Sequence, residues 1–363
     1  MTHTMAREIF ALMEDRGCRE ITFHRDPDTG LRMILVVDSL PGSTGRGLST
    51  ASASGGTRWA HTDPDIALQD ALLLARAMTR KARVLESPEG GAKAVVLRDG
   101  PKTESLLNAI GDAIAFQHGR FRTAIDLGFT MEDAERIALR SPFIDSLSHV
   151  HKGLGSTGEN TARGMVQALH LASAKILGKP LMECSIAIQG LGAVGLPLAR
   201  ELRAIGCAVI GADIDPTRCD LATAIGVEII PPDRILVAQA DILAPCAFGG
   251  VIGAQQIDDL KCRMIASGAN NPLLDEMSDE KLLRERGIVF LPDFIINAGG
   301  FLQAIVEREG GTIEQARART DIIPRKLNQA IDRSRERGVS LLTAALELHA
   351  VQHEEQRKQQ EWR

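Results

Sequence analysis

The chain has 363 residues, enough for two domains of ordinary size that each bury their own hydrophobic core. Hydrophobic residues make up 44% and charged residues 25%, which is the balance of a globular protein in water. The net charge is −5 without a block of basic residues, and no apolar run reaches about 18 residues, so neither nucleic acid nor a membrane is expected as a partner.

The amino-terminal residues 1–17 have amphipathic helical spacing and lack the basic start and apolar core of a secretion signal. The six cysteines form no C-x-x-C pair, and four of them lie in or beside apolar strand-like runs. Buried, reduced thiols explain them better than a zinc site or a disulfide framework, so we expect a cytoplasmic protein without a bound metal. The cysteines are Cys18, Cys184, Cys207, Cys219, Cys246 and Cys262.

The first predicted elements are two strands, a loop and a long helix. Residues 20–25 and 31–39 are strands joined by the turn DPDTG. Residues 41–56 are rich in glycine and serine, which favours a mobile loop over a binding loop. The helix starts at Pro64 and carries Lys81 at its far end. Its apolar stripe is Ile66, Leu68, Ala71, Leu72, Ala75 and Met78.

The rest of the first half adds two strands around a further helix. Residues 94–97 are a predicted strand that follows Lys93, and residues 121–127 are a strand that carries Asp126 near its end. A helix covers residues 104–117. Because strands and helices do not alternate regularly, we expect an α+β domain with a mixed sheet.

A second domain is expected after the segment HVHKGLGSTG at residues 149–158, whose composition indicates a hinge. We place the domains at residues 1–147 and 148–330, with carboxy-terminal helices in 331–363 joining the first domain. Apolar runs separated by helical segments predict a doubly wound parallel sheet of the Rossmann type in the second domain. The strand candidates are residues 186–189, 208–212, 227–230, 241–244, 263–266 and 288–291.

A glycine motif connects the first of these runs to a helix. Gly190, Gly192 and Gly195 fit G-x-G-x-x-G, in which the first glycine permits the turn, the second admits a pyrophosphate and the third packs the helix on the sheet. Together with Ala193 and Val194, they start a helix whose free amides attract phosphate. A plain turn is the alternative, but strand, glycines, helix and second strand in register favour a dinucleotide.

Asp213 follows the second strand, 23 residues after Gly190. An acidic side chain at this distance accepts a hydrogen bond from a ribose 2′-hydroxyl and repels a 2′-phosphate. The sequence therefore predicts NAD as the cofactor rather than NADP.

The two lysines of the first half, Lys81 and Lys93, are candidate catalytic residues. Read singly, each is a solvated surface charge. If they converged, mutual repulsion and burial would lower the pKa of one, which could then act as a base near neutral pH while the other bound a carboxylate. The residues alone leave that convergence open.

Motifs over nearly the whole chain are similar to the active-site motifs of the glutamate, leucine, phenylalanine and valine dehydrogenase family, and most similar to its leucine branch. Lys81 and Lys93 are 12 residues apart, as in that family. The matching segments are SGGTR at 54–58, MTRK at 78–81, GGAK at 90–93, TAIDLG at 123–128, IAIQGLGAVG at 186–195, APCAFGG at 244–250, ASGANNPL at 266–273 and PDFIINAGG at 292–300.

The resemblance implies the oxidative deamination of an L-amino acid by NAD, which yields a 2-oxo acid and ammonia. Lys81 would bind the substrate α-carboxylate with the backbone of Gly55 and Gly56. Lys93 would activate the water that attacks the imino acid, and Asp126 would exchange protons with the amino group. On the cofactor side, the resemblance places Asn270, Asn297 and Thr161 near the nicotinamide end, and it implies a homo-oligomer.

Four matched positions, Ser54, Ala124, Phe301 and Ala304, concern the substrate side chain. Glutamate enzymes of the family have a lysine where this chain has Ser54, and a buried carboxylate without a cation is costly. The resemblance therefore favours an apolar amino acid over glutamate. Ala124, Phe301 and Ala304 suit aliphatic or aromatic side chains and do not choose between them.

Two alternatives follow from segments that differ from the family, namely the loop before Gly55 and the charged residues Arg83, Glu86 and Glu89 between the lysines. One alternative is a non-catalytic NAD-binding subunit or sensor. The other is a dehydrogenase of a different small metabolite, which would release no ammonia.

Overall fold

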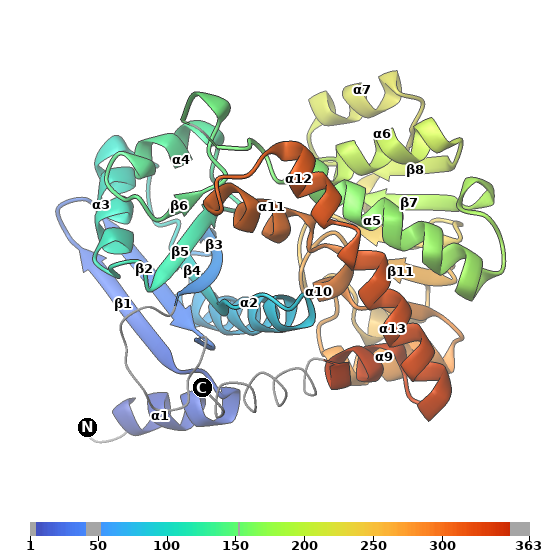
Figure 1. Ribbon diagram of the computed structural model, residues 1–363, viewed down its shortest axis with the longest axis horizontal. Helices are drawn as coiled ribbons and strands as arrows, with labels where there is room; N and C mark the ends of the chain where they lie inside the picture. Colours follow the sequence, from blue (N-terminus) through green and yellow to red (C-terminus); the bar gives the residue numbers. More distant parts are fainter. Residues whose placement is uncertain (1–4, 41–51, 152, 349–363) are drawn as a thin grey trace. The chain divides into compact units, whose positions relative to one another are not determined.

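The computed structural model describes residues 5–40, 52–151 and 153–348 (Figure 1). The described residues form two compact units, which divide between Gly155 and Ser156. The sequence placed this boundary at 147/148, but the chain folds back before it leaves the first unit, since the Gly155 amide donates to the Leu147 carbonyl at 2.9 Å. Residues 331–348, expected with the first domain, lie in the second unit.

A mixed sheet in the order β1-β2-β4-β3-β5-β6 forms the centre of the first unit. The pairs β1·β2 and β2·β4 are antiparallel, whereas β4·β3, β3·β5 and β5·β6 are parallel. This confirms the mixed sheet predicted from the sequence. The strands are β1 Glu20–Asp26, β2 Leu31–Val37, β3 Ala53–Trp59, β4 Gly90–Val96, β5 Phe121–Ile125 and β6 Ile144–Asp145.

Helices cover both faces of this sheet. Strand β2 shows why, because Met33 and Leu35 pack into a core with α3, while Ile34 and Val36 pack into a second core with α2. Alternate residues of a strand point to opposite faces, so a strand buried on both faces is apolar almost throughout. The helices are α1 Met5–Arg16, α2 Pro64–Val84, α3 Glu104–Ala115 and α4 Met131–Ala138.

The largest correction to the sequence analysis is strand β3. Residues 41–56 were expected to be a loop, yet Ala53–Trp59 is a strand between β4 and β5. A Cβ atom on Gly55 would lie 1.7 Å from the Ala92 carbonyl oxygen, so the close approach of β4 requires a glycine here. Strand propensity is low in such a segment, and the hydrogen bonds come from its neighbours. Residues 41–51 of the expected loop lie outside the described residues.

Smaller corrections concern β4 and the stripe of α2. Strand β4 begins at Gly90, so Lys93 lies inside the strand and not before it. In α2 the predicted core residues Ala71, Leu72 and Ala75 are buried, but the prediction for Ile66 is wrong, because its exposed fraction is 55%.

The second unit contains a parallel sheet in the order β12-β11-β10-β7-β8-β9. The chain runs from β7 outward through β8 to β9, and then returns to β10 on the other side of β7. This is the doubly wound arrangement predicted from the sequence. In such sheets, ligands bind where the strand order reverses, which here is beyond the carboxyl ends of β7 and β10. The strands are β7 Ser185–Gln189, β8 Ala208–Ala212, β9 Glu228–Ile229, β10 Ile242–Pro245, β11 Met264–Ala266 and β12 Val289–Leu291.

Several helices of the second unit, such as α6, lie next to this sheet, whereas α11 and α12 pack on α5 (Figure 1). The helices of this unit are α5 Gly158–Ala172, α6 Gly195–Ile205, α7 Pro216–Ala224, α8 Ala254–Ile257, α9 Glu276–Glu285, α10 Asp293–Ile296, α11 Gly299–Arg308, α12 Ile313–Arg319 and α13 Ile322–Arg337.

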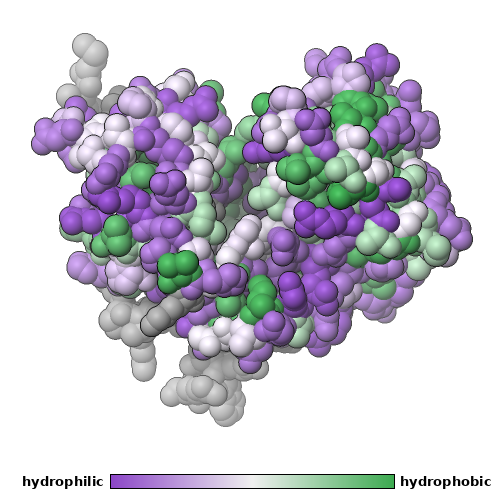
Figure 2. All heavy atoms as spheres, turned by 90° about the horizontal axis from the view of Figure 1, so that it is seen from above, coloured by the Kyte–Doolittle hydropathy of each residue, from purple (hydrophilic) through white to green (hydrophobic). Residues whose placement is uncertain are grey.

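The surface in Figure 2 mixes hydrophilic residues with small groups of hydrophobic ones. Within the described ranges, none of the helices is both long enough and apolar enough to cross a bilayer.

Candidate active site

The glycine turn of the second unit lies at the point where the strand order reverses. Gly190 has φ +88°, and a Cβ atom there would lie 2.8 Å from Cβ of Ala247 after β10. A Cβ atom on Gly195 would lie 1.8 Å from the Gly190 carbonyl oxygen. Both positions therefore need glycine for the fold itself.

Gly192 has no such internal requirement. The atom nearest to a Cβ at this position would be Nη1 of Arg218, at 3.5 Å, which is ordinary contact. The missing side chain leaves open space in front of α6, whose first residue is Gly195 and whose cap, Val194, makes no side-chain hydrogen bond. Amides in the first turn of a helix lack intrahelical partners, so this turn, with Ala193 in it, fits a pyrophosphate.

Asp213 follows β8, and its side chain is 5% exposed. Its Oδ2 accepts from the Leu191 amide at 2.7 Å and its Oδ1 from the Asp215 amide at 2.9 Å. Arg218 Nη1 lies 3.6 Å from Oδ2. The sequence analysis missed Arg218, although a cation in the first turn of the helix after the acid was a usable signal.

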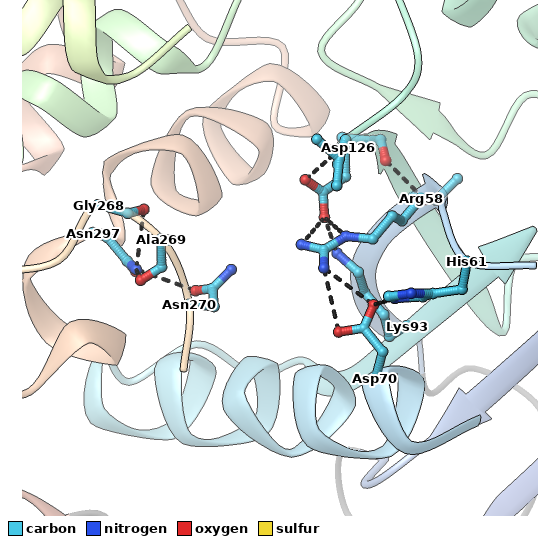
Figure 3. A network of polar contacts seen from close by, with 12 residues as sticks. Arg58, His61, Asp70, Lys93, Asp126, Gly268, Ala269, Asn270 and Asn297 are labelled. Carbon is cyan, nitrogen blue, oxygen red and sulfur yellow. Dashed lines mark hydrogen bonds and ion pairs between the residues drawn. The ribbon is translucent and has the colours of Figure 1, made fainter. Parts of the chain in front are cut away.

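Three polar residues of the second unit were expected near the nicotinamide. Asn297 is 4% exposed, and its Nδ2 donates to the Ala269 carbonyl and to Asn270 Oδ1, each at 3.2 Å (Figure 3). Its Oδ1 is buried and has no hydrogen-bond partner among the described residues. The Thr161 hydroxyl donates to the Thr157 carbonyl and accepts from the Gly300 amide. Asn297 thus offers a free acceptor, whereas Thr161 already binds backbone on both sides.

In the first unit, the buried Lys93 and the partly exposed Asp126 form a pair over Gly56. Strand β3 lies between β4, which carries Lys93, and β5, which Asp126 directly follows. Lys93 Nζ donates a hydrogen bond to Asp126 Oδ2. A Cβ atom on Gly56 would lie 2.7 Å from Lys93 Nζ and 3.0 Å from Cβ of Asp126, so the glycine provides the space in which they meet.

Burial and neighbouring charges change the titration of both groups. Burial lowers the pKa of Lys93, whose side chain is 4% exposed; Asp126 opposes this change and Arg58 adds to it. Burial alone would raise the pKa of Asp126, but Lys93 and Arg58 outweigh it and hold that pKa below its usual range. The pair therefore combines an ionised carboxylate with a lysine that releases its proton more readily than a lysine in water.

Arg58 belongs to this cluster, although the sequence analysis gave it no role. It lies on β3, and its guanidinium contacts Asp126 and also Asp70 of α2 (Figure 3). His61 contacts Asp70 in turn. The alternation of strand residues was the available signal for Arg58, since it stands two residues after Gly56, but the strand itself was not recognised.

The other predicted substrate residues lie in both units. Lys81 is buried in the last turn of α2, which packs on β4. Ser54 is buried on β3, where Gly55 and Gly56 follow it, and Ala124 on β5 pairs with Gly56. Phe301 and Ala304 belong to α11 of the second unit and are 8% exposed.

The cysteines are free, and Cys219 and Cys246 are less buried than the other four. In the part of the chain that the structure describes, no three histidine, cysteine, aspartate or glutamate side chains lie together as a metal site.

A doubly wound domain with a glycine turn suited to phosphate, and another unit with a lysine–aspartate pair, are together typical of a dinucleotide-dependent enzyme. Comparisons with known proteins specify the class. The family model described as Glutamate/Leucine/Phenylalanine/Valine dehydrogenase matches residues 212–360. Leucine dehydrogenase of Thermoactinomyces intermedius is 32% identical over 343 residues, which cover 93% of this chain and 91% of that protein.

Two further relatives are also amino acid dehydrogenases. Phenylalanine dehydrogenase of the same organism is 32% identical over 93% of this chain and 92% of its own length. The crystal structure of L-tryptophan dehydrogenase from Nostoc punctiforme matches with a TM-score of 0.74 and 28% identity, covering 96% of this chain and 99% of that one. The chain belongs to the glutamate, leucine, phenylalanine and valine dehydrogenase family.

Proposed function

We propose that this protein is an NAD-dependent dehydrogenase that converts an apolar L-amino acid to its 2-oxo acid and ammonia, reversibly. The observation that carries the proposal is the pairing of the buried Lys93 with Asp126 over Gly56. A lysine with a lowered pKa beside an ionised carboxylate is suited to proton transfer in amine and imine chemistry. Membership of the family supports this reading.

In the proposed mechanism, Lys81 binds the α-carboxylate of the substrate, together with backbone amides near Gly55 and Gly56. NAD, when bound, accepts the hydride from the α-carbon. Lys93 in its neutral form then takes a proton from the water that attacks the imino carbon. Asp126 takes a proton from the substrate amino group before oxidation and returns one to the departing ammonia.

The residues of the second unit fit NAD. Open space at Gly192 admits the pyrophosphate, and the amides of Ala193, Val194 and Gly195 lie at the start of α6. The Asp213 carboxylate would accept from a ribose hydroxyl and would disfavour a 2′-phosphate. The Oδ1 of Asn297, which has no partner among the described residues, would accept from the carboxamide of the nicotinamide, with Asn270 and Thr161 as further residues of that end.

Ser54 favours an apolar substrate, since it offers no cation to a distal carboxylate. Ala124, Phe301 and Ala304 are side chains that suit an aliphatic or aromatic substrate. The relatives are named for leucine, phenylalanine and tryptophan, so aliphatic and aromatic substrates both belong in the test.

The test is to incubate the purified chain with NAD and each L-amino acid, and to follow NADH and ammonia together. Leucine, valine, phenylalanine or tryptophan should give both products in equal amounts, while glutamate gives neither. NADH without ammonia would identify a dehydrogenase of a different metabolite. NAD binding without turnover of any amino acid would establish the non-catalytic sensor instead. Lys93→Ala should retain NAD binding and abolish turnover.

We further propose that the first unit binds substrate and forms the oligomer interface, that the second unit binds NAD, and that the protein is a cytoplasmic homo-oligomer. Light scattering in solution tests the assembly, and a mass equal to one chain would contradict it.

A further inference from the structure

We propose that Arg58, clamped between Asp70 and Asp126, is a positioning residue for the reaction: it fixes the Asp126 carboxylate against Lys93 and supplies the positive charge that remains beside it when Lys93 is neutral. This inference rests on the proposed function, because it concerns the same lysine–aspartate pair.

The geometry of the guanidinium carries the inference. Arg58 Nε and Nη2 lie 3.3 and 3.2 Å from Asp126 Oδ2, and Nη1 lies 3.3 and 3.1 Å from the two carboxylate oxygens of Asp70. Figure 3 shows one planar group joining the end of β5 to helix α2. A guanidinium presents its donors in a rigid fork, so two carboxylates on separate elements are held at fixed positions. An ammonium could not bind both in this way.

The remaining contacts of Asp126 complete its orientation. Its Oδ1 accepts from the Leu127 amide at 2.7 Å, and its own amide donates to the Thr57 carbonyl at 3.0 Å. Lys93 and Arg58 share Oδ2. The side chain of Asp126 is 30% exposed, whereas that of Arg58 is 15% exposed. Part of the Asp126 carboxylate is therefore accessible to a substrate, while its cationic partners are more deeply buried.

Asp70 is itself held in place by His61. Nε2 of His61 lies 3.1 Å from Asp70 Oδ2. His61 has φ +61°, a left-handed conformation that is unfavourable for a residue other than glycine, and its carbonyl accepts from the Arg98 amide at 2.8 Å. Strained residues persist where the surrounding contacts fix them, and they concentrate at functional sites.

The charges explain why Arg58 is needed. With Lys93 protonated, Lys93 and Arg58 balance Asp126 and Asp70. When Lys93 loses its proton, Asp126 would lose its contacting cation if Arg58 were absent, and an unpaired buried carboxylate is costly. The negative charge of Asp126 would then keep Lys93 protonated. Arg58 removes this obstacle, because it is protonated throughout the working pH range.

The neighbouring groups act on Lys93 in opposite directions. Beyond burial, which is the main cause, Arg58 lowers the pKa of Lys93, whereas Asp126 and Asp70 raise it. His61 faces Asp70 from the other side. Removal of Arg58 should therefore raise the pKa of Lys93, and removal of the Asp70 charge should lower it. A merely structural role predicts no such opposition.

The experiment compares Arg58→Met with Asp70→Asn in the full-length protein, by measuring kcat/KM against pH. Arg58→Met should lower kcat/KM by about a hundredfold, since a misplaced catalytic group costs about that much, and should move the acid limb to higher pH. Asp70→Asn should cause a smaller loss and move the acid limb to lower pH. Arg58→Lys should recover only part of the loss, because it keeps the charge but not the fork.

The matched control is Asp99→Asn, which breaks the Arg32–Asp99 ion pair at 2.6 Å on the same sheet and touches none of these groups. It should leave the pH profile unchanged. If the Arg58→Met variant does not fold, the shift of the acid limb in the Asp70→Asn variant decides whether the inference holds. A shift to lower pH supports the inference, and no shift or a shift to higher pH overturns it.

A second measurement separates this inference from the proposed function. The Nζ signal of Lys93 in ¹⁵N-lysine-labelled protein, assigned by its loss in Lys93→Met, reports the same titration without turnover. If no amino acid is oxidised but the two variants still move this titration in opposite directions, the proposed function fails and the charge relation stands. If turnover occurs but neither variant moves the titration, Arg58 has no such role.

Discussion

Gly192 of the second unit and Gly56 of the first unit both lack a side chain, but the space that each leaves differs in what surrounds it. In the second unit, a Cβ atom on Gly192 would meet nothing closer than Arg218 Nη1 at 3.5 Å, and we propose that the open space there admits a ligand. In the first unit, Gly56 makes room for Lys93 Nζ and Asp126, which are side chains of the chain itself. Under the proposed function, glycine in one unit would thus serve ligand binding, and in the other it would bring the proposed catalytic pair together. The two uses predict different losses on substitution.

Gly56→Ala should have the largest effect. The added Cβ would meet Lys93 Nζ at 2.7 Å and Cβ of Asp126 at 3.0 Å, so the pair must separate. We expect kcat to fall by about a hundredfold or more, as for other displaced catalytic groups, while NAD affinity stays unchanged. The control is Gly100→Ala, where nothing lies within 4 Å of the new Cβ. Equal activity of Gly56→Ala and the wild type would contradict the assembly role.

Gly195→Ala and Gly192→Ala test the cofactor turn as a contrasting pair. Gly195→Ala places a Cβ 1.8 Å from the Gly190 carbonyl oxygen, and we expect a loss of about 1–3 kcal/mol in the free energy of unfolding. Gly192→Ala should change the free energy of unfolding by less than about 0.5 kcal/mol. It should nevertheless weaken NAD binding, measured by fluorescence titration. Equal NAD affinity in Gly192→Ala and the wild type would remove the ligand explanation for Gly192.

Asp213→Asn tests the choice between NAD and NADP. The substitution removes the negative charge that repels a 2′-phosphate and leaves Arg218 close by, so kcat/KM with NADP should rise by about tenfold relative to NAD. The double variant Asp213→Asn with Arg218→Gln should lose most of this gain. An NADP preference already present in the wild type would refute the role of Asp213.

The pH dependence of wild-type activity is the test with the smallest expected effect. Burial lowers the pKa of Lys93, and a base must be neutral to act. Activity should therefore rise with pH through a midpoint below about 10.4, the value for a free lysine. A midpoint at or above that value would show that Lys93 is not the base.

The cofactor turn was predictable from the sequence because its signals are local. Strand, glycines, helix and acid follow one another between Ser185 and Asp213, and each has a signature of its own. The parallel sheet around it was predictable for the same reason, since its strands are apolar runs with helices between them. Arg218 was missed although it has a local signal, its position in the first turn of the helix that follows Asp213.

The lysine–aspartate pair was foreseen only through the resemblance to a family. Lys93 and Asp126 are 33 residues apart, and Arg58 and Asp126 are 68 apart. Nothing in composition or periodicity indicates that such residues meet, and the strand that brings them together, β3, contains two adjacent glycines and was taken for a loop.

The sequence by itself thus determined the dinucleotide turn, the acid that follows it and the order of strands and helices in the second unit, because these depend on neighbours along the chain. The tertiary structure decided that Arg58, Lys93 and Asp126 share one site. That result depends on the strand order β4-β3-β5, in which hydrogen bonds and close backbone approach from both sides make a strand of residues with little tendency to form one.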